Sequence, residues 1–277
     1  MKSLLPALHS FCNPLIDRYA VILSMLDEAE IPHITYLHEG KRHIIVSNRT
    51  SDPDREQGII LAAHHDRVRG SPGANDNGAA VFQLLKAALL LQKVNKPWLI
   101  VWTDKEELLP GESLKDQGSY GLAKRLIRKG MGYWPVFIFD ATGIGDTLLI
   151  STMGDFLNSG LDLAPLRAKV MDTARAIGLP YILAPSPFSD DGGFLTAGMK
   201  AQTITLLPAA EATELKRRID NEPGFANLLV AQKTELRRRL LPQTWRGMNS
   251  PNDSYGKLTP KIFNKMKELA VELVGTR

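Results

Sequence analysis

The chain has 277 residues, 44% of them hydrophobic, which suits one α/β domain with a full core. The single cysteine, Cys12, excludes an intrachain disulfide and a thiolate metal site, so any metal must be bound by histidines and carboxylates. The formal net charge is +4, and the basic clusters 216–218 and 237–239 lack interleaved aromatic residues. We interpret these clusters as solvated helix ends and expect no nucleic-acid partner.

The N-terminal 25 residues contain Asp17 and Arg18 and lack a continuous apolar core followed by a cleavage site. No run of 18 apolar residues occurs anywhere. We therefore predict neither a signal peptide nor a membrane-spanning helix, and we expect a cytoplasmic protein without a membrane partner.

Apolar spacing and turn residues predict these elements in the first half of the chain: a helix over 13–29, two short strands within 33–48, a buried strand over 58–66, a helix opening at 73–80 and continuing to about 91, a buried strand over 98–104, and a helix ending near 129. At the start of the 73–91 helix, Asp76 or Asn77 is expected near the N-cap.

The second half predicts further alternation: strands over 136–143, 147–152 and 201–207, helices over 162–177 and 259–274, a loop over 189–198 leading into a short helix, two charged helices within 209–240, and a loop over 244–258. Strands alternating with helices indicate a three-layer α/β/α fold with a mostly parallel mixed sheet. We predict one domain over 1–277, with 209–243 as a helical insertion within it.

Three of the buried strands end in residue types that bind metals. They end in His64-His65-Asp66, in Asp104 to Glu107, and in Asp140. Ligands of open α/β sheets bind beyond the carboxyl ends of the strands, so these side chains are expected to converge. Residues i and i+2 of a strand share a face, which directs His64 and Asp66 the same way and His65 away. Asp66 could then fix the tautomer of a metal-binding His64; a structural histidine beside a surface aspartate is the alternative.

Two further segments supply carboxylates. In GANDN, Asp76 could bridge two divalent ions, although helix capping by this segment is the simpler interpretation. In KEE, one glutamate could bind a metal and its neighbour could act as general base on water, since zinc lowers the pKa of bound water to about 7. A solvated acidic turn is the alternative for Glu106 and Glu107.

The order H-x-D, GANDNGA, E-E and a strand-terminal Asp resembles the co-catalytic zinc aminopeptidases, including bacterial leucyl aminopeptidases, aminopeptidase Y and, more distantly, glutaminyl cyclases. The resemblance spans about residues 58–258 and includes Gly118-Ser119 and SDDGGF. It implies zinc as the cofactor and a peptide as the substrate. It implies the following roles: His64, Asp76, Glu107 and Asp140 as metal ligands, Asp76 bridging two ions, Asp66 as the partner of His64, Glu106 as the general base, and Asp190 and Phe194 near the substrate pocket.

One position departs from the family pattern. The loop that carries the last histidine ligand reads Asn249-Ser250-Pro251-Asn252-Asp253-Ser254, so asparagine replaces that histidine. An amide oxygen binds zinc more weakly than imidazole does and suits Mg, Ca or Mn better. We expect one complete metal site around His64, Asp76 and Asp140, and a second site with Asp76, Glu107 and Asn249 that binds weakly, holds another metal or stays empty.

These features predict a metal-dependent exopeptidase, specifically an aminopeptidase. The alternatives are a glutaminyl cyclase-like acyltransferase on the same fold and a metal-binding protein without turnover; a carboxypeptidase is less favoured because no clamp for a substrate carboxylate is identifiable. The 209–243 segment is interpreted as a surface helix pair, with a cover over the cleft or self-association through Leu228 and Leu229 as alternatives.

Overall fold

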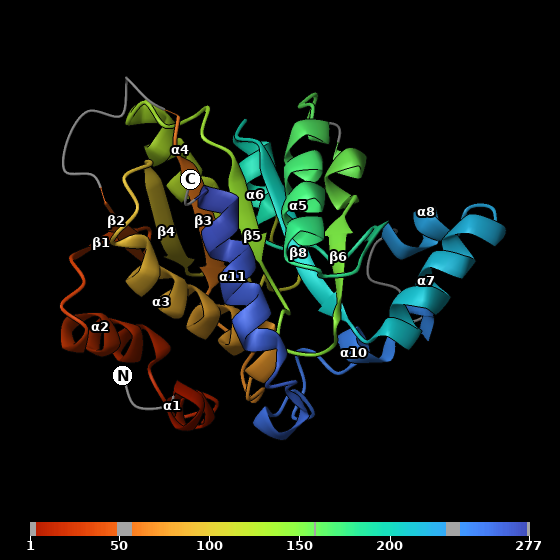
Figure 1. The fold of residues 1–277 in the computed structure, drawn as a ribbon, viewed down its shortest axis with the longest axis horizontal. Helices are drawn as coiled ribbons and strands as arrows, with labels where there is room; N and C mark the ends of the chain where they lie inside the picture. Colours follow the sequence, from red (N-terminus) through yellow and green to blue (C-terminus); the bar gives the residue numbers. More distant parts are fainter. Residues whose placement is uncertain (1–3, 49–56, 158, 231–238, 276–277) are drawn as a thin grey trace.

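The fold is organised around one eight-stranded mixed sheet (Figure 1). The computed structural model describes residues 4–48, 57–157, 159–230 and 239–275. The strand order is β1-β2-β4-β3-β5-β8-β6-β7. The strands have these bounds: β1 His33–His38, β2 Lys41–Ser47, β3 Ile59–His64, β4 Trp98–Thr103, β5 Val136–Phe139, β6 Thr147–Ser151, β7 Tyr181–Ala184 and β8 Ala201–Leu207.

The centre of the sheet is parallel and its flanks are mixed. Strands β4, β3, β5 and β8 pair in parallel, whereas β2 runs antiparallel to β4 and β6 antiparallel to β8. All four central strands therefore end at the same edge of the sheet, the lower edge in Figure 1. This arrangement confirms the predicted mostly parallel mixed sheet.

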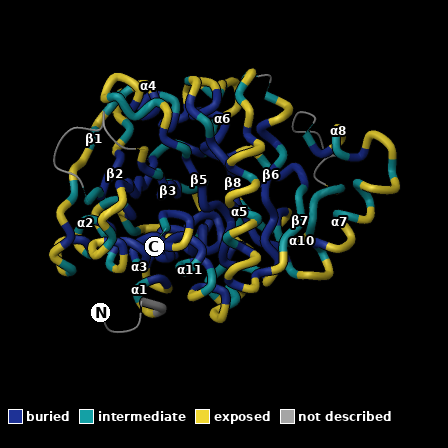
Figure 2. The backbone as a smooth tube through the Cα atoms, turned by 45° about the horizontal axis from the view of Figure 1, so that its top comes forward, coloured by how far each residue is buried: buried dark blue, intermediate teal, exposed yellow. Residues whose placement is uncertain are grey.

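Helices cover both faces of the sheet, as the predicted three-layer fold requires. One face packs against α3 (Ala79–Leu91), α5 (Ala164–Ala176) and α11 (Ile262–Val274), with α1 (Leu4–Phe11) and α2 (Arg18–Glu28) beside them; the other packs against α4 (Gly118–Arg128) and α6 (Asp191–Thr196). The strand period of two divides the core: Leu61 and Ala63 of β3 face the first layer, and Ile60 and Ala62 face the second. Figure 2 shows the central strands buried along their length.

A smaller cluster occupies the β7 end of the sheet. Helices α7 (Ala209–Asn221), α8 (Phe225–Val230) and α10 (Gln243–Arg246) pack against β6, β7 and β8 around Phe225, Leu229 and Trp245. Leu229 is 2% exposed, so of the two leucines considered for self-association only Leu228, 44% exposed, reaches the surface. Lys216, Arg217 and Arg218 pair with acidic residues close by in the chain, as a solvated face would. Arg237 and Arg238 lie outside the described residues.

The structure differs from the predicted elements in several places. The 189–198 segment, predicted as a loop before a short helix, itself contains helix α6. Helix α2 begins at Arg18 and not at 13, because the Asp17 side chain caps it by accepting the amide hydrogens of Tyr19 and Ala20. Helix α1 and strand β7 were not expected; both are short, and packing of Leu8, Phe11 and Ala184 into the core stabilises them where local pattern is too weak. The 244–258 segment is not all loop, since it contains most of α10 and the 3-10 turn Tyr255–Lys257.

Within the described residues, no helix combines the length and the apolar character that crossing a bilayer would require.

Candidate metal centre

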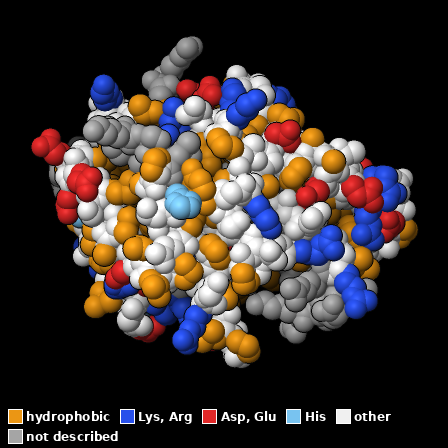
Figure 3. Space-filling model, turned by 90° about the horizontal axis from the view of Figure 1, so that it is seen from below, with side chains coloured by type: hydrophobic (Ala, Val, Ile, Leu, Met, Phe, Trp, Pro, Cys, Tyr) orange, Lys and Arg blue, Asp and Glu red, His pale blue; other side chains and the backbone are white. Residues whose placement is uncertain are grey.

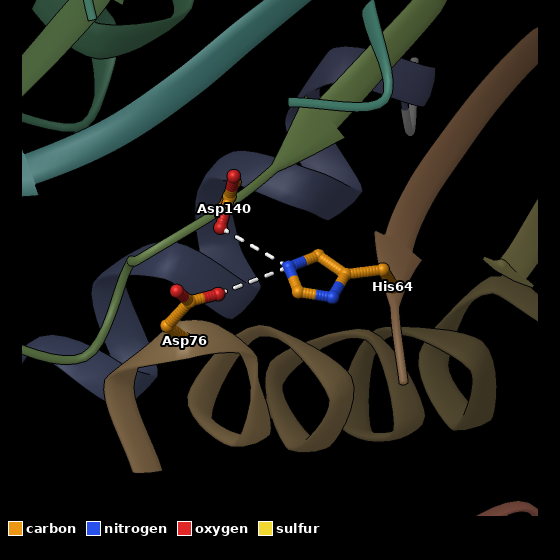
Figure 4. Close-up of side chains that lie close together, drawn as sticks. All are labelled: His64, Asp76 and Asp140. Carbon is orange, nitrogen blue, oxygen red and sulfur yellow. Dashed lines mark ion pairs between the residues drawn. The ribbon is translucent and has the colours of Figure 1, made fainter. Parts of the chain in front are cut away.

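The site is built around His64, the last residue of β3. Its imidazole is fully buried, with Nδ1 3.4 Å from Oδ1 of Asp66. Its Nε2 lies 3.1 Å from Oδ1 of Asp76 and 3.5 Å from Oδ1 of Asp140, and Figure 4 shows both carboxylates directed at this nitrogen. His64 and Asp66 therefore contact each other as the i, i+2 spacing predicts. One ring nitrogen faces an orienting carboxylate, and the other faces a pair of carboxylates.

The sheet brings Asp140 to His64. Strands β3 and β5 are parallel neighbours, and Asp140 is the residue after β5, so both side chains lie at the same edge. The Asp140 amide donates to the carbonyl of Ile204 in β8, which extends the ladder by one residue and fixes the backbone there. Convergence at the strand ends, expected from the sequence, is thus a consequence of strand pairing.

The Asp76 segment is anchored differently from the prediction. It forms the irregular turn η2 (Ala74–Gly78), in which Asp76 has non-helical φ and ψ values of −113° and 87°. The N-cap of α3 is Gly78, which makes no side-chain capping bond. Asn77 therefore lies next to the N-cap, as expected, but the alternative in which this segment serves only to cap the helix is wrong.

The two asparagines that flank Asp76 bind the β5 end instead. Asn77 Nδ2 donates to the carbonyl of Phe139 at 2.8 Å, and its Oδ1 accepts the amide of Ala141 at 3.3 Å. Asn75 Oδ1 accepts the amide of Gly143 at 2.8 Å. These three bonds hold the segment that carries Asp76 against the segment that carries Asp140.

Asp66 also positions the Glu106-Glu107 turn after β4. Its carboxylate accepts the amide of Glu106 at 3.1 Å and the amide of Glu107 at 3.0 Å. Glu106 is 9% exposed, and Gln117 Nε2 donates to its Oε1 at 3.4 Å. Glu107 Oε1 is buried without a hydrogen-bond partner. A solvated acidic turn is therefore wrong for this pair, because Glu106 is buried and Glu107 is partly buried.

The electrostatics of this group favour a bound cation. Burial raises the pKa of Glu106 well above its usual value, and burial together with Asp76 raises the pKa of Glu107 to about 9. Burial alone would lower the pKa of His64, yet its contacts with Asp140, Asp66 and Asp76 raise it well above 6.5. Several carboxylates buried together are costly unless they are neutralised, and a divalent ion neutralises them most directly.

The distances fit such an ion. One ligand atom from each of His64, Asp76 and Asp140 lies within 4.8 Å of the others, and all three side chains are buried. Ligands about 2.1 Å from a tetrahedral zinc ion lie roughly 3.4 Å apart, close to the separations of Nε2 from the two carboxylates. Nε2 of His64 and Oδ1 of Asp140 are buried and have no hydrogen-bond partner. Atoms that bind a metal ion would be left without such a partner in the same way.

Asn249 does not join this group in the same way. It lies in the turn after α10, is exposed, and has a left-handed φ of 56°. Within the described part of the chain, no hydrogen bond or ion pair connects Asn249 to Asp76 or Glu107. Its loop nevertheless reaches the site, because the Asp253 carboxylate accepts the amides of Asn75 at 2.8 Å and Asp76 at 3.0 Å.

Two residues that the resemblance placed near a substrate pocket are fully buried. Phe194 packs in the core on the α4 and α6 face, so it does not line an open pocket. Asp190 accepts a hydrogen bond from the Thr103 hydroxyl at the end of β4.

Sequence reasoning overlooked Asp253 and Arg18 as parts of the site. Asp253 stands in the loop that carries Asn249, and its position in the family pattern could have indicated it. Arg18 is 4% exposed and donates to the carbonyls of His65 and Gly73, but no local signal distinguishes it from an ordinary helix arginine.

The buried acidic group does not form an exposed acidic patch. On the face at which the parallel strands end, hydrophobic and uncharged groups cover most of the left and centre, and basic and acidic side chains lie together at the right-hand end (Figure 3). Asp76 and Asp140 are only 4% and 8% exposed.

The sequence and the fold were compared with those of known proteins. The sequence model of peptidase family M28 matches residues 43–273. No curated protein sequence matches the chain.

Several solved structures share the fold. The LapA aminopeptidase of Legionella pneumophila superposes with a TM-score of 0.66 at 14% identity, over 99% of this chain and 70% of that one. BSAP, a zinc aminopeptidase from Bacillus subtilis, gives 0.59 at 19% identity, over 84% and 49%. A glutaminyl cyclase of Bacteroides thetaiotaomicron bound to N-acetylhistamine gives 0.69 at 17% identity, over 99% and 95%. At these identities the likeness establishes the fold.

Proposed function

Because this chain belongs to peptidase family M28, we propose that it is a metal-dependent aminopeptidase that removes N-terminal residues from peptides. The observation that carries the proposal is the buried His64, Asp76 and Asp140 group, with both carboxylates directed at Nε2 of the histidine. Family membership supports a metallopeptidase, and the residues supply a complete ligand set for one ion.

We assign one metal ion, zinc, to His64, Asp76 and Asp140. Zinc would supply Lewis-acid polarisation of the scissile carbonyl and acidification of the attacking water. Asp66 holds the imidazole in the tautomer that leaves Nε2 free to bind. A second ion between Asp76 and Glu107 would have the exposed Asn249 as its remaining protein ligand, so we propose that it binds far more weakly than the first.

Glu106 is the proposed general base. It is buried beside the ligand group, and its raised pKa brings its proton affinity closer to that of a catalytic base working near neutral pH. Glu106 takes the proton of the attacking water and returns it to the leaving amine. Gln117 donates to Oε1 of Glu106 and to the carbonyl of Ser189, which restricts the rotation of the carboxylate.

The proposal is tested with Glu106→Gln, a substitution that keeps shape and removes the base. We expect kcat on aminoacyl-p-nitroanilides to fall by about 10²- to 10⁴-fold, the usual contribution of general acid–base catalysis. Zinc content by elemental analysis should stay unchanged, because Glu106 is not in the ligand group. Glu112→Gln is the matched control: Glu112 stands in the same loop and pairs with Lys105 at 2.8 Å, so its loss should leave kcat nearly unchanged.

Two results would contradict the proposal. Hydrolysis that survives Glu106→Gln at the wild-type rate removes the base from the mechanism. A purified protein that neither contains a divalent metal nor regains activity with zinc removes the metal-dependent reaction altogether.

A second candidate is a glutaminyl cyclase-type acyl transfer on the same fold. The observation that favours it is that only one complete ligand group is present among the described residues. Peptides that begin with glutamine, followed by mass spectrometry, separate the two reactions: loss of ammonia with the residue retained indicates cyclisation, and release of free glutamine indicates an aminopeptidase. A protein that binds zinc and does neither is a metal-binding protein without turnover.

A further inference from the structure

Arg18, at the start of α2, is a buried arginine with an unusual set of partners. It is 4% exposed, yet within the described residues its guanidinium makes no ion pair with a carboxylate. It donates instead to four backbone carbonyls. Nη1 donates to His65 at 3.4 Å and Asp66 at 3.5 Å, and Nη2 donates to Pro72 at 2.7 Å and Gly73 at 2.6 Å.

These carbonyls belong to the two segments that carry the proposed ligands. His65 and Asp66 directly follow His64, and Pro72 and Gly73 directly precede the turn that carries Asp76. One planar group therefore spans the chain on both sides of the 67–71 connection. Any shift of either segment relative to the other would break bonds to the same side chain.

The segment that carries Asp76 is also hydrogen-bonded to Asp253. Asp253 accepts the amides of Asn75 and Asp76, and its own carbonyl accepts the amide of Ala74 at 3.1 Å. In the stretch from Pro72 to Asp76, the first two carbonyls therefore accept from the Arg18 guanidinium, and the last two amides donate to the Asp253 carboxylate. The backbone at Gly73 is packed too closely for a side chain, because an added Cβ would lie 2.7 Å from Nη2 of Arg18 and 2.7 Å from the carbonyl oxygen of Asp76.

The chemistry of this position requires arginine. A guanidinium offers donors in a fixed planar fork, so it can hold carbonyls of two segments at once, whereas a lysine ammonium is a compact point charge on a flexible stem. The Phe11 ring, 4.6 Å from Cζ, packs against the guanidinium and excludes water. Burial lowers the pKa of Arg18 to about 10, so the side chain stays charged at neutral pH.

We propose that Arg18 is a positioning residue of the metal centre, which sets the separation of His64 and Asp76 and thereby the affinity for the ion. The inference rests on the proposed function only in that the site binds a metal. Arg18 precedes the residues matched by the family model, 43–273, so the N-terminal helices contribute to the site from outside that region.

The experiment compares Arg18→Met and Arg18→Lys with the control Arg67→Met. Arg67 donates to the carbonyls of Phe11, Asn13 and Ile16, so it ties the same N-terminal helices to the domain without touching either ligand segment through its side chain. For each purified full-length variant, the zinc dissociation constant is measured by competition with a chromogenic chelator, and Tm is measured without metal.

We expect Arg18→Met to weaken zinc binding by about 10- to 100-fold, the usual effect of losing a residue that orients ligands. Arg18→Lys keeps the charge and loses the fork, and it should give a smaller loss. Arg67→Met should lower the Tm of the metal-free protein and leave the zinc dissociation constant within about threefold of wild type, because it affects anchoring alone.

The outcomes separate this inference from the proposed function. If wild type binds no zinc, the proposed function itself fails and this inference falls with it. If wild type binds zinc and both Arg18 variants that fold bind it equally well, the positioning role alone is overturned. An equal loss in Arg67→Met would also overturn it, because general anchoring of the N-terminal helices would then explain the effect. Arg18→Lys keeps the test decisive if Arg18→Met does not fold.

Discussion

The two halves of the proposed metal centre are held by different kinds of structure. On one side, His64 and Asp140 follow the paired parallel strands β3 and β5. The turn that carries Asp76 is hydrogen-bonded to the end of β5 and the segment after it through Asn75 and Asn77. On the other side, Asn249 lies exposed in a turn near the C-terminal end of the chain. Ligands at strand ends are fixed by the sheet, whereas a loop ligand is fixed only by its loop. Such a loop position can change its residue without disturbing the fold. The resemblance to the zinc aminopeptidases predicts a histidine at position 249, where this chain has asparagine.

The largest expected difference is between His64→Ala and Asn249→Ala. Removing one of three ligands, and the imidazole among them, should weaken zinc binding on the order of 1,000-fold or more and abolish hydrolysis. Asn249→Ala should change the zinc affinity of the first site less than about threefold, since an exposed amide contributes little binding energy. Isothermal titration with zinc measures both.

Asn249→His probes the same contrast from the opposite direction. An imidazole at this position should raise the zinc stoichiometry from one ion to two if the loop lies within reach of Asp76 and Glu107. If His64→Ala and Asn249→Ala lost zinc affinity to the same extent, the proposed difference between the two halves would be refuted.

A smaller effect is expected from Asp66→Asn. This carboxylate contacts His64 Nδ1 and accepts the amides of both glutamates, so its charge orients the histidine and the Glu106-Glu107 turn together. Because the amide keeps the shape but weakens these bonds, zinc affinity should fall by about 10- to 100-fold. Chelator competition measures the loss, and Asp104→Asn, a change at the end of the neighbouring strand, serves as control. Unchanged affinity in Asp66→Asn would limit Asp66 to a structural role.

Zinc binding should also depend on pH. The pKa of His64 is raised well above 6.5 and that of Glu107 to about 9, so the metal-free protein holds protons in this range that a bound ion displaces. Affinity should therefore rise with pH, by about tenfold per pH unit for each displaced proton. For His64, the stabilisation of the metal-free fold is fully present below about pH 6.5 and is lost as pH rises through the raised pKa. For Glu107, the metal-free fold loses stability as pH rises from about 4.5 to about 9, where the unfolded chain is ionised and the buried carboxyl is not.

Thermal unfolding with and without zinc at pH 6.5, 7.5 and 8.5 measures this dependence. The gain in Tm on adding zinc should widen as pH increases. A constant gain would mean that no proton leaves the site, and would contradict the charge balance described for the His64 half.

Much of the fold was predictable because it rests on local pattern. The buried strands at 58–66, 98–104 and 136–143 are continuous apolar runs, and each ends abruptly in polar residues. The structure confirms these strands and their parallel pairing. Elements stabilised mainly by packing, such as α1 and β7, carry too short a pattern to be found in this way.

The site was predictable in part, for the same reason. Ligands of open α/β sheets bind beyond the carboxyl ends of the strands, so the strand ends that carry His64 and Asp140 were expected to converge on a divalent metal. The role of each residue and the hydrolytic reaction came from the resemblance. The Asp76 turn was interpreted as a helix cap because asparagine and aspartate are common caps. Only the folded chain shows that Asn75 and Asn77 bond to the segment after β5.

The sequence by itself determined the alternation of strands and helices, the residue types at the strand ends and the asparagine at position 249, since all of these are properties of neighbouring residues. Tertiary structure alone decided which groups hold the ligands in place. Arg18 reaches carbonyls 47 to 55 residues away, and Asp253 reaches amides 177 and 178 residues away. These bonds join segments far apart in the chain, so local spacing does not predict them, although the family pattern could have indicated Asp253.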